Sequence, residues 1–131
     1  MSLSRNMFIG AAVAAAVLLP ATAFADAHSE IVNAGMHAGF AAGAPDVAGA
    51  HAHLHHALNC IVGPSGDGFD AKEMNPCANA GKGAIADTIS TSKKASLEAA
   101  AAKAREGIAA ADLATAQKDA SDLRVMLNKQ E

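Results

Sequence analysis

Four histidines lie within six consecutive residues of this chain, at His51, His53, His55 and His56. The neutral imidazole ring is the commonest protein ligand for transition metals. If the segment is helical, His51 and His55 lie at i,i+4 on one flank, and His53 and His56 lie at i,i+3 on the other. Either pair can chelate one metal ion from a single helix. The spacing therefore predicts a metal site on this helix.

Further ligands are expected from the helix that precedes this one. A short hairpin lays two successive helices side by side, which brings His37 and Met36 toward the cluster. The predicted ligand set is His51, His53, His55, His56, His37 and Met36. Imidazole-rich sites suit copper, nickel, zinc and cobalt, and the affinity peaks at copper. Two other interpretations stay open at this point, a solvated polar face and an interface that senses pH.

The two cysteines, Cys60 and Cys77, flank a loop rich in glycine and proline. In an oxidising compartment, an even number of cysteines predicts a disulfide. A bridge across a loop of this size would stabilise the fold by about 3 kcal/mol. If the thiols were reduced, Cys60 with His56 and Met36 would favour Cu(I). Neither cysteine begins a C-x-x-C-H motif, which excludes conventional c-type haem attachment.

The first 25 residues have the features of a secretory signal peptide. Arg5 supplies a positive charge, residues 7–19 form an uncharged apolar run, and residues 23–25 read Ala-Phe-Ala before Asp26. The apolar run is shorter than the roughly 20 residues that a membrane span needs. We therefore expect a signal peptide at 1–25 and one mature domain at 26–131. The mature domain is expected in a bacterial periplasm, without a membrane anchor after cleavage.

The composition narrows the classes of partner. The formal net charge is −3, and nucleic-acid binding would require a basic patch. The chain has no Trp and no Tyr, and alanine supplies most of its apolar residues. Helices packed on such small side chains make a thin core. A disulfide, a bound metal ion or self-association would add the missing stability. The candidate partners are a metal ion, further copies of this chain and a periplasmic protein.

The helical segments are predicted from apolar periodicity and turn residues. In the first, Val32, Met36 and Phe40 follow one another at i,i+4, with Ile31 beside them, and together they form its apolar stripe. Gly107 is expected to separate the third helix from the fourth. The predicted helices span 27–42, 45–60, 80–105 and 109–128, with a loop at 62–79. This pattern predicts an all-α protein, an antiparallel four-helix bundle of two helical hairpins with the disulfide-closed loop between its second and third helices.

The two halves of the mature chain share a layout. A shift of 66 residues aligns the segment 44–50 with the segment 110–116, where alanines coincide and Asp46 coincides with Asp112. Each half then has a helix, a short turn that contains glycine, an aspartate and a second helix. This layout favours two similar hairpins.

The pattern resembles the small His-rich periplasmic metal-binding proteins, which are alanine-rich four-helix bundles. The resemblance is carried by residues 36–39 (Met-His-Ala-Gly), by residues 46–51 (Asp-Val-Ala-Gly-Ala-His) and by the analogous hairpin at 105–116. It implies uptake of copper and other divalent metals. This chain departs from that family because its second hairpin has no histidine and because it carries the loop between Cys60 and Cys77. These departures favour one defined site over high-capacity scavenging.

The leading functional hypothesis is a periplasmic metal-binding protein for sequestration, delivery or resistance. The first alternative is a haem-binding bundle, since helical bundles hold haem between histidine or methionine ligands on facing helices. The second is a stress or adaptor protein that needs no cofactor. An enzyme is not expected, because Cys60 and His56 are the one nucleophile–base pair in view and a disulfide would disable it.

Overall fold

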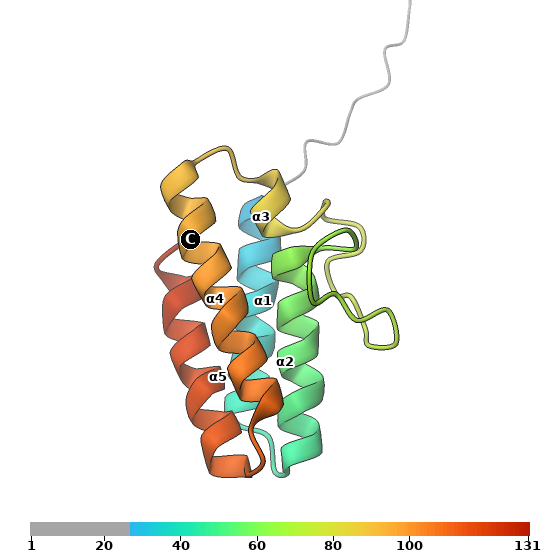
Figure 1. Ribbon diagram of the computed structural model, residues 1–131, viewed down its shortest axis with the longest axis vertical. Helices are drawn as coiled ribbons and strands as arrows, with labels where there is room; N and C mark the ends of the chain where they lie inside the picture. Colours follow the sequence, from blue (N-terminus) through green and yellow to red (C-terminus); the bar gives the residue numbers. More distant parts are fainter. Residues whose placement is uncertain (1–26) are drawn as a thin grey trace, which may run out of the picture.

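The computed structural model describes residues 27–131. The regular secondary structure of this part of the chain consists of five helices, with no strand. The helices are α1 (Ala27–Ala42), α2 (Val47–Val62), α3 (Ala84–Asp87), α4 (Thr91–Ala109) and α5 (Leu113–Asn128) (Figure 1). The predicted signal peptide and Asp26 lie outside the described residues. Within the described part, no helix has the length and apolar character needed to span a membrane.

The four long helices lie side by side (Figure 1) around a main core, and a second, smaller cluster consists of the buried alanines at 44, 50, 110 and 116. α1 packs mainly against α2 and α5, and α4 packs mainly against α5 and α2. Alanines occupy much of the buried surface, which lets the helix axes approach closely. The largest apolar side chains of the core are Ile31, Leu54, Leu58, Ile61, Leu97, Leu123 and Leu127.

The apolar stripe that the sequence predicts on α1 is buried only in part. Val32, Met36 and Phe40 are 37%, 49% and 51% exposed, whereas Ile31 and the alanines at 34, 38 and 41 are fully buried. These alanines also follow helical spacing, and their small size suits the close approach of two neighbouring helices at once. Consequently the larger apolar side chains are left on the outer surface of α1.

The predicted third helix, 80–105, is divided in the structure. Gly83 has φ 110°, which a continuing helix does not allow, and the short α3 ends at Asp87. Ser90 then starts α4, because its hydroxyl accepts a hydrogen bond from the Lys93 amide at 3.3 Å. Ile89, which lies within the predicted helix 80–105, falls in the break and is fully exposed. Gly107 does not end the helix, since α4 continues to Ala109.

The shared layout of the two halves extends to the bounds and caps of the helices. α2 and α5 are each 16 residues long and are offset by 66 positions. Asp46 caps α2 by accepting a hydrogen bond from the Gly49 amide at 2.7 Å, and Asp112 caps α5 by accepting one from the Thr115 amide at 2.9 Å. We call α1 and α2 the first pair and α4 and α5 the second pair.

The two pairs are also joined by equivalent hydrogen bonds. His51 on α2 donates from Nε2 to the Ala110 carbonyl, in the turn of the second pair, at 2.9 Å. Gln117 on α5 donates from Nε2 to the Ala44 carbonyl, in the turn of the first pair, also at 2.9 Å. His51 and Gln117 are 66 residues apart, as are the two carbonyls. The two pairs thus exchange matching contacts across one end of the molecule.

The predicted disulfide between Cys60 and Cys77 is confirmed, with both residues buried. It ties the last turn of α2 to the far end of the long loop, which lies beside α2 (Figure 1). This attachment holds the loop close to the helix that carries the clustered histidines.

Candidate metal centre

Three histidines from the first pair of helices form a cluster. α1 supplies His37, and α2 supplies His53 and His56, which are one turn apart. Each offers one ring nitrogen, and the three nitrogens all lie within 4.8 Å of one another. The short turn between the two helices is what brings the residues together, since it lays α1 directly against α2.

The spacing inside the cluster matches that of metal ligands. Nδ1 of His37 lies 3.3 Å from Nδ1 of His53. Two nitrogens bound to one tetrahedral zinc ion at about 2.0–2.1 Å would be about 3.3 Å apart. The centroid of the His56 ring lies 5.1 Å from that of His37 and 5.5 Å from that of His53, so all three rings surround one point. Phe40 packs on the outer side, edge-on to His37.

A carboxylate from the disulfide-closed loop faces the third histidine. Nε2 of His56 lies 3.5 Å from Oε2 of Glu73. The other ring nitrogen, Nδ1, is buried and has no hydrogen-bond partner within the described part of the chain. Metal-bound histidines typically present one nitrogen to the ion and the other to a carboxylate or carbonyl group. The orientation of His56 toward Glu73 therefore leaves Nδ1 for a ligand.

Asn59 holds the loop in the position that this contact requires. Its amide nitrogen donates to the carbonyl oxygens of Asp70 and Met74 at 3.0 and 3.1 Å, and its carbonyl oxygen accepts from the Asp70 amide at 2.9 Å. The Asn59 side chain is fully buried, and it precedes Cys60 of the disulfide. The loop is thus fixed on both sides of Glu73, by Asn59 and by the disulfide.

The surroundings of the cluster favour the neutral form of two of its rings, His37 and His56. Burial, together with the positive charges that His56 and His53 would carry, lowers the pKa of His37 from 6.5 to about 4. Burial and His53 also lower the pKa of His56, and Glu73 opposes this effect. Neutral imidazole is the form that binds metal, so near neutral pH protons compete little for these two ligands.

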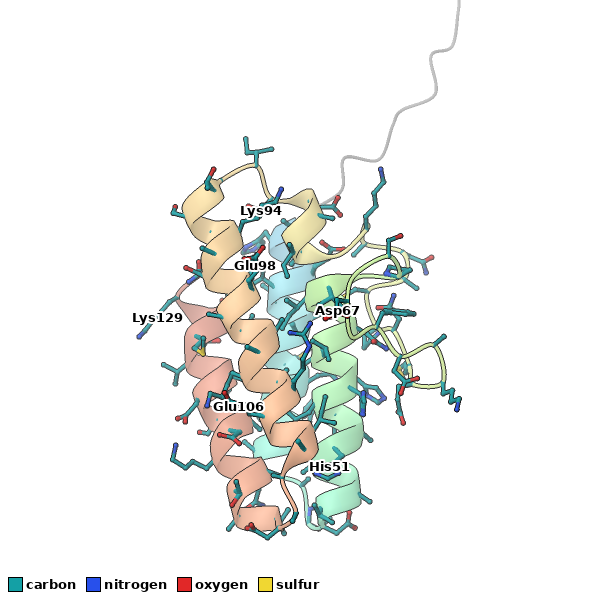
Figure 2. All side chains as sticks on the ribbon, viewed as in Figure 1. His51, Asp67, Lys94, Glu98, Glu106 and Lys129 are labelled. Atoms are coloured by element: carbon teal, nitrogen blue, oxygen red, sulfur yellow. A yellow bond between two sulfur atoms is a disulfide. The ribbon has the colours of Figure 1, made fainter. Side chains whose placement is uncertain are left out.

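The remaining predicted ligands lie elsewhere. His51 lies near the N-terminal end of α2, beside the turn of the second pair (Figure 2), where its Nε2 donates to the Ala110 carbonyl. Nδ1 of His55 lies 3.9 Å from Oδ2 of Asp70 in the loop. Met36 is half-exposed on α1. None of these three residues belongs to the cluster, and the disulfide removes Cys60 as a thiolate ligand.

The sequence offered no reason to single out Glu73 or Asn59, and it indicated Phe40 as an apolar residue of the first helix and not as a neighbour of the site. Glu73 is separated from His56 by an irregular loop, so no periodic pattern connects the two residues. One signal was available for Asn59: an amide side chain beside a cysteine that closes a loop is well placed to bind the loop's backbone. Phe40 follows His37 by three residues, which is the spacing of neighbours on one helix face.

The cluster therefore combines three imidazoles, a carboxylate that orients one of them and a loop fixed by a disulfide. This set can hold a divalent transition metal ion and leaves a coordination position open for a fourth ligand. Comparisons with protein-family models, with curated proteins and with solved structures find no match to this chain.

Proposed function

We propose that this protein binds a transition metal ion through His37, His53 and His56, and that it serves metal sequestration, delivery or resistance. The observation that carries the proposal is the convergence of three ring nitrogens within 4.8 Å from two helices. Two of the three histidines belong to the crowded segment 51–56, and the third comes from the neighbouring helix.

The chemistry of the ligands favours copper, with nickel and zinc as weaker competitors. All three donors are imidazole nitrogens, and the stability of complexes with such donors peaks at Cu(II) among the divalent first-row metals. Three protein ligands leave room for water or for a ligand from another molecule. An open position suits a carrier that must release its ion, whereas a closed four-ligand site suits a structural ion.

The disulfide supports a place of action outside the cytoplasm. Structural disulfides persist in oxidising compartments such as the bacterial periplasm. The expected signal peptide at 1–25 agrees with that placement. We further propose that the four long helices form an antiparallel four-helix bundle, because two short turns join α1 to α2 and α4 to α5, and the members of each pair pack together.

The haem alternative gains less from the structure. A haem group needs a slot with an axial ligand, and a cleft of about 550 Å³ lies between the long loop, α3 and α4, with no histidine in its lining. The adaptor alternative has the exposed apolar side chains of α1 in its favour, but these do not identify a partner. We therefore carry metal binding forward as the proposed function.

Calorimetric titration with Cu(II) near neutral pH tests the proposal. The variant in which His37, His53 and His56 are all replaced by Ala should lose the high-affinity site. The matched control removes the other three histidines as His28→Ala, His51→Gln and His55→Ala, and it should keep the site. Equal binding by the two variants would contradict the proposal, because metal would then follow the number of histidines and not their geometry.

A further inference from the structure

A second candidate site lies away from the histidines, on the side of the long loop that faces α4. It is a cleft of about 550 Å³ between residues 62–67, residues 81–86 and α4. Ligand-binding clefts for small molecules typically measure about 300–1,000 Å³. The cleft is therefore large enough for one small organic molecule.

The walls of the cleft are held in place without a ligand. Gly63 and Gly83 have φ 69° and 110°, and they cross so closely that a Cβ on Gly63 would come within 1.7 Å of the Lys82 carbonyl oxygen. From the opposite wall, Nη2 of Arg105 on α4 donates to the Asp67 carbonyl at 2.7 Å. The crossing and this bridge fix the loop against the helices, so the cleft is preformed.

The lining combines an apolar floor with an excess of positive charge. Val62, Ile85 and Ala101 supply apolar surface. Three cations and two carboxylates also line the cleft, in a chain whose formal net charge is −3: Lys82, Lys94 and Arg105 against Asp67 and Glu98. Figure 2 labels Asp67, Lys94 and Glu98.

The ion pairs decide which of these charges face a ligand. Nη2 of Arg105 lies 3.5 Å from Oδ2 of Asp67, so the guanidinium offsets the charge of that carboxylate. The ammonium groups of Lys82 and Lys94 form no ion pair with any carboxylate in residues 27–131, and Glu98 is the one remaining carboxylate of the lining. The charge left for a ligand is thus positive.

We propose that this cleft binds a small apolar carboxylate, with its hydrocarbon part against Val62, Ile85 and Ala101 and its anionic end at Lys94 and Lys82. The apolar floor supplies the area that is removed from water, and the lysines select the sign of the head group. This site is separate from the histidine cluster and does not depend on metal binding.

Decanoate is a suitable probe, and its binding to the full mature chain can be measured by calorimetry. Ala86 is exposed at the edge of the cleft, so an indole in Ala86→Trp should fill it. Ala99 is exposed on α4 outside the lining, which makes Ala99→Trp the matched control. Lys94→Glu reverses the charge without adding bulk.

We expect decanoate to bind the unaltered protein and the Ala99→Trp control equally. Ala86→Trp should weaken binding by about tenfold or more because the indole occupies the cleft, and Lys94→Glu should weaken it by a similar factor because a charge-assisted contact is lost. Decyltrimethylammonium, which carries the opposite charge, should not bind. Absence of decanoate binding, equal binding by all variants or equal binding of the cation would overturn the proposal. Loss of binding in the variant without His37, His53 and His56 would contradict the independence of the two sites.

Discussion

The first and second pairs of helices share one scaffold but carry different chemistry at equivalent positions. Residues offset by 66 positions occupy corresponding places, and His37, His53 and His56 correspond to Lys103, Asp119 and Asp122. Nδ1 of His37 and of His53 lie 3.3 Å apart, and Lys103 Nζ lies 3.4 Å from Asp119 Oδ1. The same two helical positions thus hold an imidazole pair in one half and an ion pair in the other.

The neighbours of these positions follow the same correspondence. Phe40 packs against His37, and its counterpart Glu106 forms an ion pair with Lys103. In the second pair all groups meet opposite charges and are satisfied without any ligand. In the first pair, lowered pKa values favour uncharged rings at His37 and His56, and the buried Nδ1 of His56 has no hydrogen-bond partner among the described residues. The disulfide-closed loop adds Glu73. The comparison shows that the candidate site depends on a few side chains and one loop, added to a helix–turn–helix layout that both pairs share.

The largest effect is expected from converting the imidazole pair into its counterpart. The double substitution His37→Lys and His53→Asp should lower Cu(II) affinity by about a thousandfold or more, because it removes two of three ligands. The far-UV circular dichroism should be unchanged, since the second pair already holds Lys and Asp at these places. If the variant kept its Cu(II) affinity in competition with a chelator, the imidazole pair would not be the feature that distinguishes the two halves.

Removal of the disulfide should have the next largest effect. Cys60→Ala with Cys77→Ala should lower the free energy of unfolding by about 3 kcal/mol, because the unfolded chain is no longer constrained. Metal affinity should fall as well, since the loop that carries Glu73 loses one of its two attachments. Urea unfolding and chelator competition on the same samples measure the two effects. A stable variant with unchanged metal affinity would show that the loop does not support the site.

Glu73→Gln should weaken metal binding by about 10- to 100-fold, the usual cost of losing a carboxylate that orients a metal-bound histidine. The free energy of unfolding should change little, because Glu73 is partly exposed. Asp70→Asn is the matched control, since Asp70 faces His55 outside the cluster. If both variants lost affinity equally, general loop charge would explain the effect better than orientation of His56.

The stability of the metal-free protein should depend on pH in a defined direction. The pKa of His37 is about 4 in the folded protein and 6.5 as its ordinary value, so between these values the unfolded chain binds more protons. The contribution of neutral His37 to the free energy of unfolding is therefore fully present above pH 6.5 and is lost as the pH falls toward 4. His37→Gln should flatten this part of the profile in thermal unfolding. An unchanged slope in that variant would mean that another group causes the decline.

The smallest effect is expected at His51, whose counterpart is Gln117. His51→Gln should preserve both stability and metal affinity, because a glutamine makes the same contact in the second pair. His51→Ala and Gln117→Ala should each cost about 1 kcal/mol, the typical contribution of one hydrogen bond. A loss of metal affinity in His51→Gln would place His51 among the ligands.

The sequence was sufficient for the helical class, the disulfide and the partnership of His37 with the second helix. Periodicity and spacing carry these features because they depend on residues close together in the chain or on two cysteines alone. It was insufficient for the burial of α1, where alanine and not Phe40 faces the core, and for the break at Ile89. The contact of Glu73 with His56 could not be predicted either, because the path of a long loop depends on tertiary hydrogen bonds such as those of Asn59.

Zinc titration followed by long-range proton–nitrogen NMR of the histidine rings tests the central claim most directly, because it reports each ring nitrogen separately. We predict that one equivalent of zinc shifts one nitrogen in each of His37, His53 and His56, with Nδ1 as the bound atom of His56. The rings of His28, His51 and His55 should keep their shifts at that ratio. Perturbation of His51 and His55 in place of His37 would contradict the account, since the metal would then follow the crowded segment of the sequence and not the cluster that the fold assembles.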